Sequence, residues 1–226
     1  MPEVASLALV AGLAGVVAAV GWRDRRRLRA SRRGLLDACV GALDEVRLSH
    51  GGDDFPRISG RHRGRKVAVE LIPDTMTMRR LPQLWLQVTL IGRVPVRSGV
   101  AALVRPAGYE FYSLTSTFHH VLDPPPGFPF EVIVRGEDAG AEAVLGAAAH
   151  TMAAILSDRQ VKEVAITRNG LRVIRQAAEG RRGEHLLLRQ AVFDDAEVAG
   201  RDLLELLAEL DRLLSALAVA GTERAT

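Results

Sequence analysis

The N-terminal end of the chain places the strongest constraint on the fold. Nineteen consecutive residues, Val4 to Trp22, carry no charged side chain, and a basic segment, Arg23 to Arg33, follows at once. A helix of this length spans about 28 Å, close to the ~30 Å hydrocarbon core of a bilayer. Eight of its residues are leucine or valine, which favour insertion. The pattern predicts a transmembrane helix over residues 1–22 that is followed by a polar domain.

The charges on either side of this run predict its orientation. Seven arginines and one acid, Asp24, lie within residues 23–33, whereas Glu3 is the only charged side chain before the run. Basic segments stay on the cytoplasmic side, and a cleavable signal peptide carries its positive charge ahead of the apolar run. We therefore expect a basic juxtamembrane collar (residues 23–33) in an uncleaved single-pass protein of a bacterial inner membrane. Its N-terminus would lie outside and its C-terminal domain in the cytoplasm, with the lipid bilayer as its first partner.

The rest of the chain is nearly neutral. The whole sequence has a net charge of +3, to which the collar contributes +6 and Glu3 contributes −1, so residues 34–226 carry −2. A nucleic-acid-binding domain usually carries a basic stripe, so no nucleic-acid partner is expected. The single cysteine, Cys39, excludes an intramolecular disulfide and is predicted to be a buried apolar side chain.

Apolar periodicity and turn residues predict the elements that follow the collar. A helix is expected over Arg32–Val46 and a basic hairpin over Phe55–Gly60 and Arg65–Ile72, and then a central strand over Leu84–Gly92. Short strands are expected at Val100–Val104, Tyr109–Tyr112 and Phe130–Val134, with a loop at Ser113–Pro129 and a helix at Gly140–Leu156. A second hairpin turns at Asn169-Gly170, so that Ile166 faces Val173 and Val164 faces Arg175. The last elements are a strand at Glu184–Arg189 and a long helix at Asp195–Leu217.

Short hairpins indicate antiparallel pairing, and interspersed helices indicate an α+β fold. We expect the N-terminal transmembrane helix to be followed by an antiparallel-sheet domain with helices packed on it. This cytoplasmic domain would cover residues 34–217, with a possible internal boundary near residue 136. Residues 218–226 would form a disordered tail.

The sequence contains none of the common catalytic or phosphate-binding motifs. GxGxxG, GxxxxGK[ST], HExxH, CxxC and GxSxG are all absent from the expected contexts, so no cofactor is expected. The one tight group of possible ligands or acid–base residues is His119, His120 and Asp123. Adjacent residues of a strand point to opposite faces, so a shared metal would require a loop here, and a polar loop is the simpler interpretation.

Two further patterns are candidates for binding. The basic hairpin carries side chains suited to an anion or a lipid headgroup, or simply to a solvated edge: Arg57, Arg61, Arg63, Arg65 and Lys66. In the N-terminal helix, the small residues Ala11, Gly15 and Ala19 recur every four positions. This spacing allows close helix–helix contact with another membrane protein or with a second copy.

Three stretches resemble an uncharacterised group of bacterial single-pass membrane proteins. They are GRHRGRKVAVELIPDTMTMRRLPQLWLQVTL at 60–90, VRPAGYEFYS at 104–113 and PPPGFPFEVIVRG at 124–136. The group has no assigned activity, so the resemblance implies a bacterial inner-membrane setting and no catalytic residue.

The function that the sequence favours is a membrane-anchored, cytoplasmic, non-catalytic binding or scaffolding module. One alternative is a membrane-tethered enzyme that uses the loop at residues 113–123. Another is a sensor of an anionic lipid or ligand that uses the region at residues 57–80.

Overall fold

Strands with apolar side chains at alternate positions build one large sheet. The computed structural model describes all residues except 1, 76–80, 182–191, 194–195 and 224–226, and it describes the backbone alone for 2–11, 25 and 221–223. Within this part of the chain, the sheet has nine strands in the order β1-β2-β3-β4-β9-β8-β5-β7-β6, and each adjacent pair is antiparallel. The predicted α+β fold with an antiparallel sheet is confirmed.

The sheet is assembled from both halves of the chain. Its strands are β1 (Asp44–His50), β2 (Pro56–His62), β3 (Arg65–Asp74), β4 (Gln83–Ile91), β5 (Val100–Val104), β6 (His120–Leu122), β7 (Val132–Gly136), β8 (Val161–Thr167) and β9 (Gly170–Glu179). The described helices are α1 (Pro2–Arg33), α2 (Ala141–Leu156) and α4 (Gly200–Glu223), with short 3-10 helices η1 (Asp37–Ala42) and η2 (Leu114–Ser116). The strand predicted at Glu184–Arg189 lies outside the described residues.

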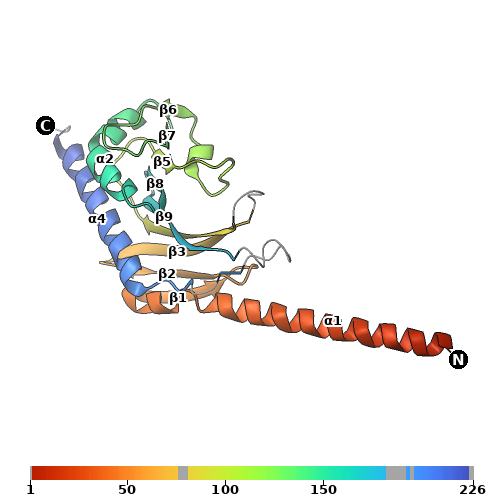
Figure 1. The fold of residues 1–226 in the computed structure, drawn as a ribbon. Coiled ribbons are helices and arrows are strands. Elements are labelled where there is room, and N and C mark those ends of the chain that lie inside the picture. The colour runs from red at the N-terminus through yellow and green to blue at the C-terminus, as the bar shows by residue number, and fades with distance from the viewer. Residues whose placement is uncertain (1, 76–80, 182–191, 194–195, 224–226) are drawn as a thin grey trace.

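The two faces of the sheet are covered differently. Helices α2 and α4 pack on one face, called here the helix-covered face, where α2 contacts β5, β7 and β8 and α4 contacts β4 and β9 (Figure 1). The main apolar core lies between these helices and the sheet, and strand residues such as Leu86 and Val88 point into it. Trp85, one position along β4, points to the opposite face, where it packs with Tyr112 and Ile174. A loop rather than a helix covers this second face, called here the loop-covered face.

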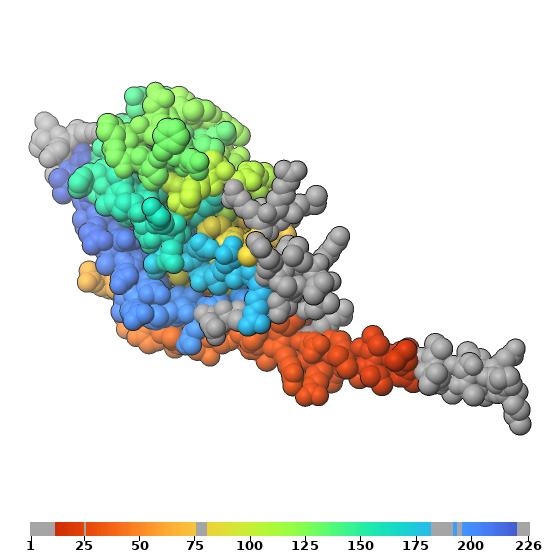
Figure 2. Space-filling model, viewed as in Figure 1, coloured from red at the N-terminus to blue at the C-terminus, as the bar shows by residue number. Residues whose placement is uncertain are grey.

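Helix α1 corrects the first prediction made from the sequence. It runs from Pro2 to Arg33 and joins the apolar run to the collar in one helix that stands clear of the folded body (Figures 1 and 2). Among the described residues, no helix has both the length and the apolar character needed to cross a membrane. Gly12, Gly15 and Gly21 add no apolar side chain, and arginines occupy the second half of the helix. The predicted transmembrane helix and the predicted single-pass location in the inner membrane are therefore wrong.

The base of α1 is attached to the sheet through the collar. Arg29 and Arg33 form ion pairs with Asp54 in the β1–β2 turn, at 3.2 and 2.9 Å. The hydrogen bond from Arg33 is the main reason that the pKa of Asp54 lies below its ordinary value. Arg32 lies over the Phe55 ring at 4.9 Å from its centroid. The collar therefore binds acidic and aromatic side chains of this same chain.

The segment after the collar differs from its prediction. A helix was expected over Arg32–Val46. Instead α1 ends at Arg33, the short η1 follows, and residues from Asp44 onward form the edge strand β1. Leu36 and Cys39 are fully buried there, and Cys39 donates from its Sγ to the Val198 carbonyl at 3.3 Å. Burial raises the pKa of the Cys39 thiol to about 11. Cys39 is therefore a buried structural side chain, as predicted.

The second hairpin forms where predicted but in a different register. Ile166 pairs with Leu171 and Val164 with Val173, so Arg168 and Asn169 form the turn. The shift is two residues, which leaves every side chain on its expected face. A Cβ on Gly170 would lie 2.7 Å from the Leu90 carbonyl oxygen, so this glycine allows β9 to approach β4 closely. Gly170 is therefore a strand residue that packs against β4, and it is not one of the two turn residues as predicted.

Candidate binding groove

A loop between β5 and β6 closes over the loop-covered face. This loop, called here the roof loop (residues 105–118), includes η2 and also Tyr109–Tyr112, which was predicted to be a strand. Within Tyr109–Tyr112, buried side chains alternate with exposed ones although the segment forms no strand. Glu110 and Tyr112 point inward, whereas Tyr109 and Phe111 remain exposed.

A buried carboxylate fixes the middle of the roof loop to the sheet. Glu163 on β8 is fully buried and accepts a short hydrogen bond from the Ser113 hydroxyl and one at 3.1 Å from the Leu114 amide. It also forms a close ion pair with Arg172 on β9, whose other terminal nitrogen donates to Gln87 at 3.3 Å. A buried carboxylate is tolerated when donors surround it in this way. The arrangement ties the roof loop to three adjacent strands.

A second buried ion pair fixes the start of the roof loop. Lys162 Nζ lies 3.3 Å from Glu110 and donates to the Arg105 carbonyl at 2.6 Å. Glu110 also accepts from the Ala107 amide at 2.5 Å. The β8–β9 register shifts between Val161 and Glu163. This irregularity turns the consecutive side chains Lys162 and Glu163 toward the same face, because an extra residue in a strand interrupts the alternation of faces.

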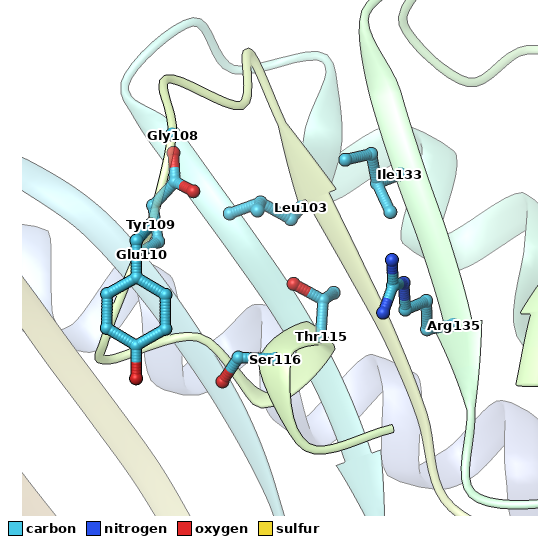
Figure 3. A pocket seen from close by; sticks show the side chains of 8 residues that line it. All are labelled: Leu103, Gly108, Tyr109, Glu110, Thr115, Ser116, Ile133 and Arg135. Atoms are coloured by element: carbon cyan, nitrogen blue, oxygen red, sulfur yellow. The ribbon is translucent and has the colours of Figure 1, made fainter. Parts of the chain in front are cut away.

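Between the roof loop and the outer strands lies a groove of about 170 Å³ (Figure 3). Leu103 on β5 and Ile133 on β7 are neighbours in the sheet and form its apolar floor. Arg135, two residues farther along β7, extends its guanidinium toward Thr115 of the roof loop (Figure 3). The full lining is Leu103, Gly108, Tyr109, Glu110, Thr115, Ser116, Ile133 and Arg135.

Exposed apolar side chains lie in and next to the groove lining. Tyr109, which is 77% exposed, lines it, and Phe111 follows two residues later in the roof loop. Val121 on the edge strand β6 is 70% exposed and lies directly opposite Arg135 in the β6–β7 pair. Apolar and aromatic side chains around a partly buried arginine are typical of a protein-binding surface.

Beside the groove, two buried polar atoms lack a partner among the described residues. They are the Tyr112 hydroxyl and the Trp85 Nε1, whose rings are 5.8 Å apart. Burial is the main reason that the pKa of Tyr112 lies well above its ordinary value, and the nearby carboxylates of Asp74, Glu110 and Glu163 add to the shift. The phenol is therefore held in its neutral form.

Two of the predicted basic residues of the β2–β3 hairpin pair with acids of this chain. Arg61 pairs with Glu45 at 2.8 Å, and Arg63 pairs with Asp211 of α4 at 3.1 Å. Arg57 lies at the start of β2, opposite Glu70, whereas Lys66 faces Arg61 near the turn and Arg65 is exposed beside it. An anion-binding role for this hairpin stays a prediction.

The other predicted candidates are exposed where the structure describes their side chains. His119, His120 and Asp123 are all exposed, and within the described residues no group of three potential ligands is placed to hold a metal. In α1, Ala19 is exposed and a Cβ on Gly15 would touch nothing within 4 Å, whereas the side chain of Ala11 is not described. Helix–helix contact through this stripe stays a prediction.

Sequence reasoning singled out the loop that carries Thr115 and Ser116, but it missed the rest of the groove. Leu103, Ile133 and Arg135 lie in ordinary strand patterns that carry no motif. The isolated arginine in the apolar strand sequence VIVRG was the one available signal.

Comparison with solved structures finds a distant likeness in fold. The mycobacterial trehalose monomycolate transport factor A matches with a TM-score of 0.44 and 11% sequence identity, over 84% of this chain and 95% of that one. No protein-family model matches the sequence, and no curated protein matches it.

Proposed function

We propose that this chain is a non-catalytic binding module that holds part of a protein partner in the groove beneath the roof loop. The observation that carries the proposal is the way the roof is fixed. Glu163 holds the Ser113 hydroxyl and the Leu114 amide, and Lys162 holds Glu110 and the Arg105 carbonyl. A surface that is already ordered loses less conformational entropy when a partner binds.

The size of the groove favours a part of a larger partner over a whole metabolite. Pockets for small molecules usually measure about 300–1,000 Å³ and enclose most of the ligand. The 170 Å³ groove is smaller and accommodates about one ring-sized group, because a cavity of ~150 Å³ holds a benzene molecule. The exposed side chains of Tyr109, Phe111 and Val121 would contact the remainder of the partner.

The state of the nearby carboxylates supports binding rather than catalysis. Glu163 and Glu110 each form an ion pair with a cation and accept a hydrogen bond from one backbone amide. A general base needs a free lone pair within reach of a substrate proton. His119 and His120, the acid–base candidates from the sequence, are exposed, and neither forms an ion pair or hydrogen bond with a side chain in the described part of the chain.

Site-specific photo-crosslinking in cells that express the full chain tests the proposal. A benzophenone amino acid at position 109, on the groove, is expected to give one discrete protein adduct. The same group at position 219, exposed on α4, is the matched control and is expected not to give this adduct. Adducts that are the same at both positions, or no adduct at 109, would contradict a partner in the groove.

A further inference from the structure

Arg135 is the one cation that lines the groove. Its Nη1 donates to the Phe118 carbonyl at 3.5 Å, which is long for a hydrogen bond. The side chain is partly buried beside Ile133, the apolar floor residue that precedes it on the same face of β7. A charged group in such a place is costly unless a counter-charge accompanies it.

No carboxylate of the described chain supplies that counter-charge. Glu110 is the only acid in the lining, and it is bound by Lys162 and by the Ala107 amide. Glu137, two residues beyond Arg135, is bound by Arg168 at 2.8 Å and by the Gly99 amide at 3.1 Å. Within the described residues, no ion pair involves Arg135. Its guanidinium fork therefore retains donors suited to a carboxylate from outside.

The surroundings also define what must accompany that carboxylate. Leu103 and Ile133 present aliphatic carbons beside the guanidinium, and the groove has room for about one ring or branched side chain. Tyr109 and Val121 extend the apolar surface beyond the groove. A bare anion would leave Tyr109 and Val121 uncovered, whereas a purely apolar group would bury the charge of Arg135 without a partner.

We propose that the groove recognises a protein segment in which an aspartate or glutamate lies beside an aromatic or branched apolar residue. Arg135 binds the carboxylate, and Leu103 and Ile133 receive the apolar side chain. This inference rests on the proposed function and specifies the chemistry of the partner at the same site.

A displayed library of random seven-residue peptides, selected on the full chain, tests the inference. Selected peptides are expected to carry an acid within two positions of an aromatic or branched residue. Their Kd, measured by fluorescence polarisation, is expected to rise about tenfold or more for Arg135→Gln, because the charge pair is lost. Ile133→Asp is expected to abolish binding, because it introduces an acid on the apolar floor.

Arg47→Gln is the matched control. Arg47 is exposed on β1, at the opposite edge of the sheet, and this variant is expected to bind the peptides as the natural chain does. Arg135→Lys is expected to recover part of the affinity, since lysine keeps the charge but not the planar fork. Circular dichroism of each variant separates loss of binding from loss of fold.

Three outcomes would overturn the inference. Peptides without acids that bind normally to Arg135→Gln but not to Ile133→Asp would refute the role of Arg135 and leave a binding groove in place. Failure to select any groove-dependent peptide, together with no adduct at position 109, would remove the proposed function as well. Tighter groove binding by octanoate, tested as a free acid, than by any peptide would reassign the site to a small acid.

Discussion

The two faces of the sheet achieve burial by opposite means. On the helix-covered face, leucines of α4 such as Leu207 and Leu210 are completely buried against apolar strand residues. On the loop-covered face, the buried groups include two ion pairs, Glu163–Arg172 and Lys162–Glu110. Apolar packing tolerates many sequences of similar volume, whereas a buried ion pair requires both partners. The first face therefore provides the scaffold, and the second fixes one particular loop in one position.

The largest expected effect comes from removing one partner of a buried pair. Glu163→Ala leaves Arg172 without its carboxylate and removes the acceptor for the roof loop, so we expect a loss of about 3–5 kcal/mol in the free energy of unfolding. Urea denaturation measures it. Glu45→Ala, at an exposed pair with Arg61, is the control and is expected to cost less than about 1 kcal/mol.

Replacing both residues of the Glu163–Arg172 pair separates the cost of an unpaired charge from the loss of the pair itself. Changing Glu163 and Arg172 together to leucine is expected to recover most of the lost stability, because no unpaired charge remains. Hydrogen exchange at the Leu114 amide is nevertheless expected to be faster in this double variant than in the natural chain, because the Glu163 acceptor is gone. Equal losses for Glu163→Ala and Glu45→Ala would mean that the two faces do not differ in this way.

A somewhat smaller effect is expected on the helix-covered face. Leu207→Ala leaves a cavity between α4 and the sheet, with an expected cost of about 2–5 kcal/mol. Leu204→Ala, on the same helix at a side chain that is 44% exposed, is the control and is expected to change stability by no more than about 0.5 kcal/mol. Peptide binding in the groove should survive Leu207→Ala in the folded fraction, and its loss there would show that the two faces are coupled.

The smallest effect is expected at Tyr112. Tyr112→Phe removes a buried hydroxyl that has no partner among the described residues, so stability near pH 7 is expected to change by less than about 1 kcal/mol.

The pH dependence of this variant is more informative. The folded chain keeps the Tyr112 proton above pH 10.0, the ordinary pKa of tyrosine, whereas the unfolded chain releases it. The natural chain therefore loses stability as the pH rises above 10, and Tyr112→Phe is expected to lose less. Urea midpoints at neutral and alkaline pH measure the difference. The exposed Tyr109→Phe should follow the natural chain, and identical curves for all three proteins would contradict a raised pKa.

The sequence predicts those elements whose burial follows a local rule. Alternating valines and leucines identified the β2–β3 hairpin and β4, and the stripe of Val144, Leu145 and Ala148 identified α2. It failed at β1, because Val46 is the only residue of this edge strand that is even partly buried, so no alternating pattern marks it, and the spacing of Leu43 and Val46 suggested a helix. The end of α4 was also set too early, since the helix continues past Leu217 to Glu223.

The groove and the residues that fix its roof loop were harder to predict, because residues far apart in the sequence come together there only through strand pairing. Lys162 and Glu163 look like solvated residues of a strand, and the irregularity in β8 that turns both inward depends on the register with β9. Glu110 is buried because Lys162 lies beside it, and the two are far apart in the sequence. The apolar run at Val4–Trp22 also misled. The transmembrane prediction used the length of this run, whereas the helix that contains it extends to Arg33 and is not apolar enough to cross a membrane.

The strand order has a consequence for the nascent chain. β8 and β9, which leave the ribosome after β1 to β7, occupy the centre of the sheet between β5 and β4. Until Val161–Glu179 has emerged, β4 and β5 each present an open backbone edge, and such edges invite pairing with other chains. The β8–β9 hairpin thus joins two half-sheets, and the two open edges are closed only when it docks.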